Sequence, residues 1–223
     1  FSVAGKKALV TGGATGIGRM MAEALVQAGA DVMICSRKAE HCEQVARELN
    51  ALDALDTLDA PGSAEGFGAD LSTEAGVVAA AQAVMDRTDR LDILANNAGA
   101  TWGADYESFP RGAWDKVMNL NVTSIFELTR NLTPLLAAAA TDADPARIIN
   151  TASVMGIMPV ADGCYSYSTS KAAVIHLTRI LANEMASRRI TVNAFAPGPF
   201  PSKMTAFATA SEAGAAATGA KNP

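Results

Sequence analysis

The chain has 223 residues, enough for one domain with a full-sized core, and its composition of 49% hydrophobic and 18% charged residues is ordinary for a globular protein. A formal net charge of −5 without any basic block argues against nucleic acid as a partner. No run of about 18 apolar residues occurs, so no membrane span is expected, and the absence of a signal-peptide pattern favours a cytoplasmic location. The three cysteines are scattered, which predicts neither a disulfide framework nor a metal site.

Short β-branched or apolar runs alternate with longer helical patterns along the chain. Strands are predicted at residues 7–11, 31–35, 66–69, 91–96, 147–151 and 191–196. Helices are predicted at residues 17–28, 39–49, 74–87, 112–140 and 168–188. Two parallel strands joined by a helix form a right-handed unit, and repeating that unit gives an α/β fold with a doubly wound parallel sheet of the Rossmann type. Residues 1–223 are expected to form a single domain.

Two stretches interrupt this regular pattern. Pro134 lies inside the predicted 112–140 helix and should kink or split it, because proline cannot donate a helical hydrogen bond. Residues 51–66 repeat a simple A-L-D or T-L-D unit and contain Pro-Gly, which predicts an extended surface loop within the domain.

A glycine-rich turn, T-G-G-A-T-G-I-G, follows the first predicted strand directly. The N–H groups at a helix start lack partners, and glycines let the backbone approach a ligand, so this position suits the pyrophosphate of a dinucleotide. The spacing G-x-x-x-G-x-G differs from the G-x-G-x-x-G fingerprint, and a tight structural turn is the alternative. The candidate cofactor contacts here are Gly12, Thr15, Gly16, Ile17 and Gly18.

The end of the second predicted strand bears on which cofactor binds. An acidic residue there would accept hydrogen bonds from the ribose of NAD, whereas an arginine accommodates the 2′-phosphate of NADP. The chain reads V-M-I-C-S-R-K, with Ser36, Arg37 and Lys38 and no carboxylate. This pattern favours NADP(H), and the alternative for Arg37 is a solvated charge at a helix start.

The stretch Y-S-Y-S-T-S-K offers one lysine two tyrosines. On a helix, residues four apart share a face, so Tyr167 can work with Lys171, whereas Tyr165 points elsewhere and is a candidate for lining a substrate pocket. A nearby ammonium stabilises a phenolate and lowers the pKa of the phenol. Such a pair could exchange a proton with a substrate.

Five motifs occur in one order: T-G-G-A-T-G-I-G, N-N-A-G at residues 96–99, Ser153 at a strand end, Y-S-T-S-K ending at Lys171, and P-G at residues 197–198. Over residues 6–205 the chain resembles the short-chain dehydrogenase/reductase family. That resemblance implies an oxidoreductase that interconverts a small carbonyl compound and an alcohol with a nicotinamide cofactor, here NADP(H).

The resemblance also implies roles for single residues. Catalysis would fall to Asn121, with Asn119 as a less suitable neighbour, and to Ser153, Tyr167 and Lys171. In this scheme the tyrosine donates the proton, the serine holds the substrate oxygen, and Asn121 holds a water that links the lysine to solvent. Further cofactor contacts would come from Ser36 and Arg37, and from Asp70, Leu71, Asn97, Ala98, Gly99, Pro197, Gly198 and Thr205, with Ser202 as an alternative to Thr205.

The substrate is less well defined by the sequence. The stretch A-G-A-T-W-G-A-D-Y-E-S-F-P-R-G-A-W-D-K-V-M-N-L-N-V-T-S resembles β-ketoacyl reductases of the rhamnolipid type, which implies a 3-oxoacyl thioester reduced by NADPH. Sugar, polyol and steroid dehydrogenases share the core motifs and are alternatives. A nucleotide-binding or scaffold subunit without turnover is an alternative of another class.

The end of the chain departs from the family pattern. Family members continue through another helix and a final strand, whereas here the chain reads S-E-A-G-A-A-A-T-G-A-K-N-P and supplies no evident seventh strand. We therefore expect a domain that is incomplete at its C-terminus. The family also implies a homo-oligomer, a tetramer or a dimer, that pairs through the helices predicted at residues 112–140 and 168–188.

Overall fold

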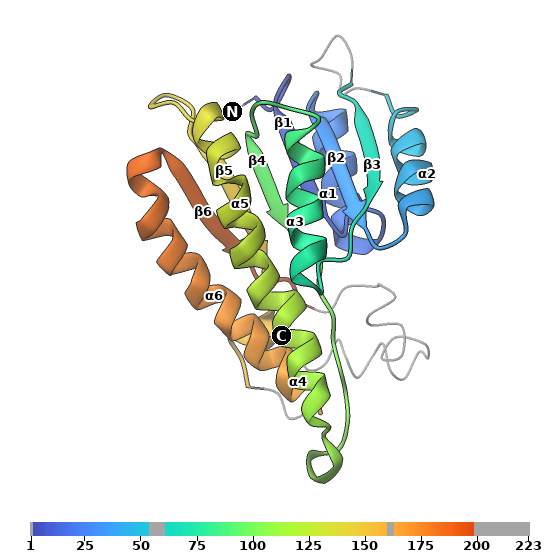
Figure 1. Cartoon of the computed structure of the whole chain (residues 1–223), viewed down its shortest axis with the longest axis vertical. Helices are drawn as coiled ribbons and strands as arrows, with labels where there is room; N and C mark the ends of the chain where they lie inside the picture. The colour runs from blue at the N-terminus through green and yellow to red at the C-terminus, as the bar shows by residue number, and fades with distance from the viewer. Residues whose placement is uncertain (1, 54–60, 160–162, 199–223) are drawn as a thin grey trace.

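The computed structural model describes residues 2–53, 61–159 and 163–198. These residues form a six-stranded sheet in the order β3-β2-β1-β4-β5-β6, in which every neighbouring pair is parallel (Figure 1). The strand order reverses between β1 and β4, as in a doubly wound sheet. The predicted Rossmann-type α/β fold is therefore confirmed.

The strands are β1 (Lys7–Thr11), β2 (Asp31–Ser36), β3 (Ala64–Gly68), β4 (Ile93–Asn96), β5 (Ala146–Thr151) and β6 (Ile190–Phe195). The α-helices are α1 (Gly16–Gln27), α2 (Ala39–Leu49), α3 (Glu74–Met85), α4 (Arg111–Met118), α5 (Ser124–Ala139) and α6 (Tyr165–Met185). The short elements are the 3₁₀ turns η1 (Tyr106–Ser108), η3 (Val154–Gly156) and η4 (Ala186–Arg188), and the π-helical turn η2 (Asn119–Thr123).

Both faces of the sheet are covered, which explains why its strands read as continuous apolar runs. Leu9 and Leu94 lie in a core cluster with side chains of α3, α5 and α6. Their chain neighbours Val10 and Ile93 lie in a second cluster with side chains of α1 and α2. Because successive strand residues point to opposite faces, β1 and β4 each supply both clusters.

The structure corrects the helix predicted at residues 112–140. The helical segment does change its winding, but at the π-helical turn η2 between α4 and α5 rather than at Pro134. Pro134 lies inside α5 on its exposed side, and Arg130, whose carbonyl loses its N–H partner to the proline, is exposed as well. A π turn inserts one extra residue into the helix and often marks a functional site.

Other boundaries differ from the prediction by one to three residues, and the starts of α6 and β3 are examples. Helix α6 begins at Tyr165 rather than at residue 168. Strand β3 begins at Ala64, inside the segment predicted as a loop, because it pairs in register with β2 from Val32 and Ala64 onward. Strand pairing thus overrides the weak strand propensity of the A-E-G-F-G sequence. Residues 54–60 of the same segment lie outside the described residues.

The predicted absence of a seventh strand concerns residues 199–223, which lie outside the described residues, so it stays a prediction. The single domain likewise stays a prediction.

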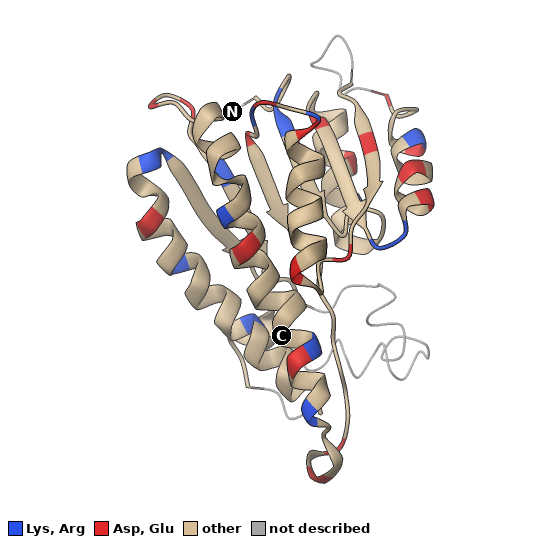
Figure 2. Ribbon diagram, in the orientation of Figure 1, with Lys and Arg blue, Asp and Glu red and all other residues tan. Residues whose placement is uncertain are grey.

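Figure 2 shows Lys and Arg interspersed with Asp and Glu along the helices and at the strand ends. Among the described helices, none combines the length and the apolar composition that a bilayer crossing requires.

Replacing Leu94 with alanine tests the two-sided core. Leu94 is fully buried in the central strand β4, so Leu94→Ala should lower the free energy of unfolding by about 2–5 kcal/mol. Val78→Ala, at an exposed position of α3, is the control and should change it by less than about 0.5 kcal/mol. Urea unfolding followed by circular dichroism measures both, and equal effects would contradict the assigned core.

Candidate active site

The predicted site residues that the structure describes gather at the edge of the sheet where the strands end. The glycine-rich turn follows β1, residues 97–99 follow β4, and Ser153 follows β5. β1 and β4 are neighbours although they are separated by two strands in the sequence. Ligands of open parallel sheets bind beside such a point of reversal, outside the carboxyl ends of the strands.

The glycine-rich turn is tight and leaves a helix start accessible. Gly12 has φ +66°, a conformation that glycine adopts without strain. A Cβ on Gly18 would lie 2.3 Å from the carbonyl oxygen of Gly12 and 2.4 Å from Asn97 Nδ2. Thr15 is the N-cap of α1 but makes no side-chain cap hydrogen bond, so it does not cover the N–H groups of Gly16, Ile17 and Gly18. The close packing is consistent with a tight structural turn, and the uncapped helix start is suited to binding an anion.

The segment after β2 is basic and exposed. Arg37 and Lys38 are both exposed, and Ser36 lies with Oγ 3.0 Å from the sulfur of Cys42. Asp70 is exposed, and hydrogen bonds from Ser72 hold the pKa of its carboxyl below the usual value, with a smaller contribution from the charge of Arg37. Arg37 therefore lies near Asp70 on this side of the edge.

Leu71 is placed differently from the other predicted cofactor contacts. Its side chain belongs to the core cluster beneath α3 and is 6% exposed. The part of Leu71 left for a ligand is therefore its main chain.

The residues after β4 are fixed to the end of β1. The Thr11 hydroxyl accepts the main-chain N–H groups of Asn97 at 2.9 Å and of Ala98 at 3.0 Å. A Cβ on Gly99 would lie 3.2 Å from Asn121 Oδ1 and 3.7 Å from Lys171 Nζ. The segment 97–99 thus joins the glycine-rich turn to the predicted catalytic residues.

Ser153 and Tyr167 meet at the end of β5. Ser153 is buried and caps η3, where its hydroxyl accepts the N–H of Met155 at 3.2 Å. Tyr167 lies in the first turn of α6, and its hydroxyl is hydrogen-bonded to the side chain of Ser153. Two hydroxyl groups are therefore held together beside the predicted cofactor edge.

Lys171 lies one turn further along α6 and is 4% exposed. Its Nζ donates to the carbonyl oxygen of Thr151 at 2.7 Å and lies 5.6 Å from the centroid of the Tyr167 ring. Burial lowers the pKa of Lys171 to about 8, because it disfavours the charged form. The helical pairing of Tyr167 with Lys171 is confirmed in the geometry.

The sequence predicts a lowered pKa for Tyr167, and this prediction is wrong for the chain without its cofactor. Burial raises the pKa of Tyr167, the hydrogen bond from Ser153 lowers it by less, and nearby Cys164 adds a small increase. The Lys171 ammonium is directed at the Thr151 carbonyl and is not among the causes of this shift. Tyr167 is therefore a neutral phenol that can donate a proton.

Asn121 belongs to the site, and Asn119 does not. Asn121 is fully buried in η2, whereas Asn119 is exposed. The amide hydrogens of Asn121 are taken by the Ala100 carbonyl at 2.9 Å and by the Ser170 hydroxyl at 2.9 Å, and its Oδ1 accepts the Ala100 N–H at 2.8 Å. A water at this residue therefore has to use atoms other than the amide hydrogens.

Tyr165 points away from Lys171, as the helical spacing predicts. Its ring makes edge-to-face contacts with Tyr106, at 5.8 Å between centroids, and with Phe109, at 5.3 Å. Tyr165 thereby ties the segment after β4 to the start of α6.

The residues after β6 reach the site from the other side. The Val154 N–H donates to the carbonyl of Pro197 at 3.1 Å, which brings this segment beside η3, and Gly198 follows at the surface. Thr205 and Ser202 lie outside the described residues.

Sequence reasoning missed three polar partners, Thr11, Thr151 and Ser170. Thr11 and Thr151 each end an apolar strand, and a polar residue at that position was the available signal. Ser170 lies inside Y-S-T-S-K but was not singled out.

A family model described as short chain dehydrogenase matches residues 6–213. The chain belongs to the short-chain dehydrogenase family. Family membership confirms the resemblance inferred from the motifs and makes the chain an oxidoreductase by descent.

The relatives within the family include reductases of acyl substrates. The rhamnolipids biosynthesis 3-oxoacyl-[acyl-carrier-protein] reductase of Pseudomonas aeruginosa is 49% identical over 205 residues, which cover 92% of this chain and 77% of the relative. The structure of Pseudomonas aeruginosa RhlG in an active-site complex with NADP superposes with a TM-score of 0.91 and 46% identity, covering 98% of this chain and 82% of that one. A 2-dehydro-3-deoxy-D-gluconate 5-dehydrogenase of Dickeya dadantii is 34% identical over 203 residues, 89% of this chain and 73% of the relative.

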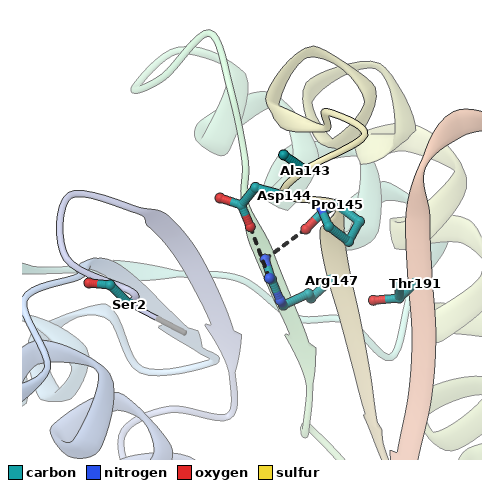
Figure 3. A pocket seen from close by; sticks show the side chains of 6 residues that line it. All are labelled: Ser2, Ala143, Asp144, Pro145, Arg147 and Thr191. Atoms are coloured by element: carbon teal, nitrogen blue, oxygen red, sulfur yellow. Dashed lines mark hydrogen bonds and ion pairs between the residues drawn. The ribbon is translucent and has the colours of Figure 1, made fainter.

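A separate cavity of about 490 Å³ lies at the opposite edge of the sheet, where β5 and β6 begin. It is lined by Ser2, Ala143, Asp144, Pro145, Arg147 and Thr191 (Figure 3). The Arg147 guanidinium is engaged by the Asp144 carboxylate at 2.9 Å and by the Pro145 carbonyl at 2.7 Å. The family motifs all lie at the other edge, and the described residues contain no cluster of acidic, histidine or cysteine side chains suited to a metal.

The lowered pKa of Lys171 predicts a pH-dependent stability. Between about 8 and 10.5 the unfolded chain keeps the proton on Lys171 while the folded chain releases it, so stability rises with pH through this window. Lys171→Met removes the titrating group, so the unfolding free energy of the parent should rise relative to that of the variant from pH 7 to pH 10.

Urea unfolding at a series of pH values measures this difference. Lys38→Met, at an exposed position, controls for the loss of one positive charge. Parallel pH curves for the parent and Lys171→Met would contradict the burial of the ammonium.

Proposed function

We propose that the chain is an NADPH-dependent carbonyl reductase with Tyr167 as proton donor, and that a 3-oxoacyl thioester is its substrate. The observation that carries the proposal is the arrangement of Ser153, Tyr167 and Lys171 at the cofactor edge. Two bonded hydroxyl groups lie there beside a buried ammonium. A carbonyl that gains a hydride needs a proton donor and a second group that holds its oxygen, and these residues supply both.

The residues at the edge fit a dinucleotide with a 2′-phosphate. The uncapped start of α1 offers N–H groups to the pyrophosphate, and Gly12, Gly16 and Gly18 bring no side chain to the turn. Arg37 and Lys38 are exposed after β2, where no carboxylate competes for the ribose. The NADP complex of the Pseudomonas aeruginosa relative supports the same choice.

When bound, the reduced nicotinamide supplies the hydride to the carbonyl carbon. The carbonyl oxygen then gains negative charge and accepts the Tyr167 hydroxyl proton, so the product is the alcohol. Ser153 Oγ donates to the same oxygen and steadies the developing charge. Without substrate the Ser153 hydroxyl donates to Tyr167 instead, and this bond keeps the two hydroxyl groups side by side where the carbonyl oxygen would bind.

Lys171 supports the proton transfer from beneath. With a pKa of about 8 it is largely charged at neutral pH, and its ammonium stabilises the phenolate that forms on Tyr167. Asn121 holds the segment after β4 against α6 through Ala100 and Ser170, and in the proposed scheme a water near it returns the proton to Tyr167 by way of Lys171.

The relatives support the substrate assignment. The rhamnolipid-type relative at 49% identity acts on a 3-oxoacyl group carried by acyl carrier protein. The 34% identity to a gluconate dehydrogenase keeps a keto sugar acid as the second candidate. The presence of Asn121, Ser153, Tyr167 and Lys171 together favours an enzyme over a scaffold subunit. The homo-oligomer and the cytoplasmic location stay predictions.

Replacing Tyr167 with phenylalanine tests the proton donor. Tyr167→Phe keeps the ring beside Lys171 but removes the hydroxyl, so kcat should fall by about 10²–10⁴-fold while NADPH still binds. Oxidation of NADPH at 340 nm is followed with acetoacetyl thioesters, keto sugar acids and simple ketones. Tyr165→Phe is the matched control and should keep most of the activity.

Two outcomes would contradict the proposal. Undiminished reduction by Tyr167→Phe would remove the assigned proton donor. Binding of NADPH without turnover of any carbonyl by the unaltered chain would favour the scaffold reading instead.

Replacing Arg37 with aspartate tests the cofactor choice. The guanidinium would pair with the 2′-phosphate, so Arg37→Asp should weaken NADPH binding by about tenfold or more and shift the preference toward NADH. Fluorescence titration with both cofactors measures the ratio of the two dissociation constants. Arg47→Asp on α2 controls for the change of net charge, and an unaltered ratio in Arg37→Asp would exclude Arg37 as the phosphate contact.

A further inference from the structure

A chain of hydrogen bonds runs along the carboxyl ends of three neighbouring strands and ends at Lys171. Asn97 Nδ2 donates to the Thr11 carbonyl at 3.1 Å, and the Thr11 hydroxyl accepts the Asn97 N–H at 2.9 Å. The Thr151 hydroxyl donates to Asn97 Oδ1 at 3.3 Å, and the Thr151 carbonyl accepts from Lys171 Nζ at 2.7 Å. The glycine-rich turn after β1 is thereby connected to the lysine of α6 through β4 and β5.

Thr151 connects the two parts of this series of hydrogen bonds, because its two polar groups bond to different partners. Its hydroxyl reaches β4, and its carbonyl reaches α6. The register of β4 with β5 ends at the pair Asn96 and Asn150, whereas on the β6 side it continues to Thr151 and Phe195. Beyond the last main-chain pair of β4 and β5, the side-chain hydrogen bond of Thr151 therefore connects the two strand ends.

We propose that Thr151 is a positioning residue for Lys171. Its side-chain bond to Asn97 fixes the Thr151 peptide group, whose carbonyl accepts the hydrogen bond from the Lys171 ammonium. The same bond therefore keeps the lysine in a fixed position relative to the glycine-rich turn. Thr151 is 7% exposed, and water does not readily replace a lost bond at such a site. The kinetic part of this inference rests on the proposed function, and the placement of Lys171 does not.

The groups that face Lys171 determine what a loosened carbonyl would do. Tyr167 faces it from α6 and is the titratable neighbour, Asn121 lies across Gly99, and Thr151 faces it from β5. Burial is the cause of the lowered pKa of Lys171, and among the described residues no carboxylate forms an ion pair with it. Because the carbonyl bond favours the charged form, weakening that bond lowers the pKa further.

Thr151→Val is the decisive variant, because it removes the hydroxyl and keeps the β-branched shape and the main-chain carbonyl. We expect kcat to fall about tenfold from a misplaced lysine. The alkaline limb of the kcat profile should move to lower pH by about half a unit or more. Thr151→Ser keeps a hydroxyl and should restore both values.

Thr129→Val is the matched control. Thr129 is fully buried and accepts a hydrogen bond from Asn96 at 3.4 Å, but it does not contact Lys171. This variant loses a buried hydroxyl of the same kind, so it should leave the pH profile of kcat unchanged even if its melting temperature falls. If Thr151→Val does not fold, Thr151→Ala removes the same hydroxyl with less bulk and takes its place.

A titration without substrate separates this inference from the proposed function. The Cε signal of Lys171 in ¹³C-lysine-labelled protein, assigned with Lys171→Arg, reports its pKa in the unliganded chain. A lower pKa in Thr151→Val than in the parent and Thr129→Val would support the proposal, and an equal pKa would overturn it. Absence of turnover in the parent would contradict the proposed function alone, since the titration still decides the role of Thr151.

Discussion

A buried ammonium held by a main-chain carbonyl is the interaction on which the site depends. Lys171 is charged in ordinary solution, yet α6 places it at the end of β5, where the Thr151 carbonyl accepts a hydrogen bond from its Nζ at 2.7 Å. Burial of a charge is costly unless the charged group is hydrogen-bonded. The packing of α6 on the sheet holds Lys171 where the Thr151 carbonyl supplies that bond. The same packing places Tyr167 one turn away and within reach of Ser153.

The parallel sheet explains why distant segments meet at this lysine. Strands β1, β4 and β5 are neighbours, and each ends at the same edge. Each of the three therefore delivers its following segment to one place: the glycine-rich turn, residues 97–99 and Ser153. The π turn η2 adds Asn121 from the helical side, where its amide links Ala100 to Ser170.

Much of this arrangement could be predicted from the sequence, because the signals are local. The apolar runs and helical patterns gave the strand and helix alternation, and the i, i+4 spacing identified Tyr167 as the partner of Lys171. The π turn in place of a kink at Pro134 and the early start of β3 depend on packing and strand pairing that local patterns do not contain. The pKa of Tyr167 was predicted in the wrong direction because a charge four residues away is visible in the sequence and the desolvation of a folded site is not.

In the proposed reaction, one carbonyl oxygen of the substrate contacts both hydroxyl groups at the end of β5. A crystal structure of the chain with NADP⁺ and a 3-hydroxyacyl thioester tests it most directly. We expect the C3 oxygen to lie about 2.6–3.2 Å from both Tyr167 Oη and Ser153 Oγ, with the nicotinamide ring facing C3. A well-ordered thioester whose C3 oxygen contacts neither hydroxyl would contradict it.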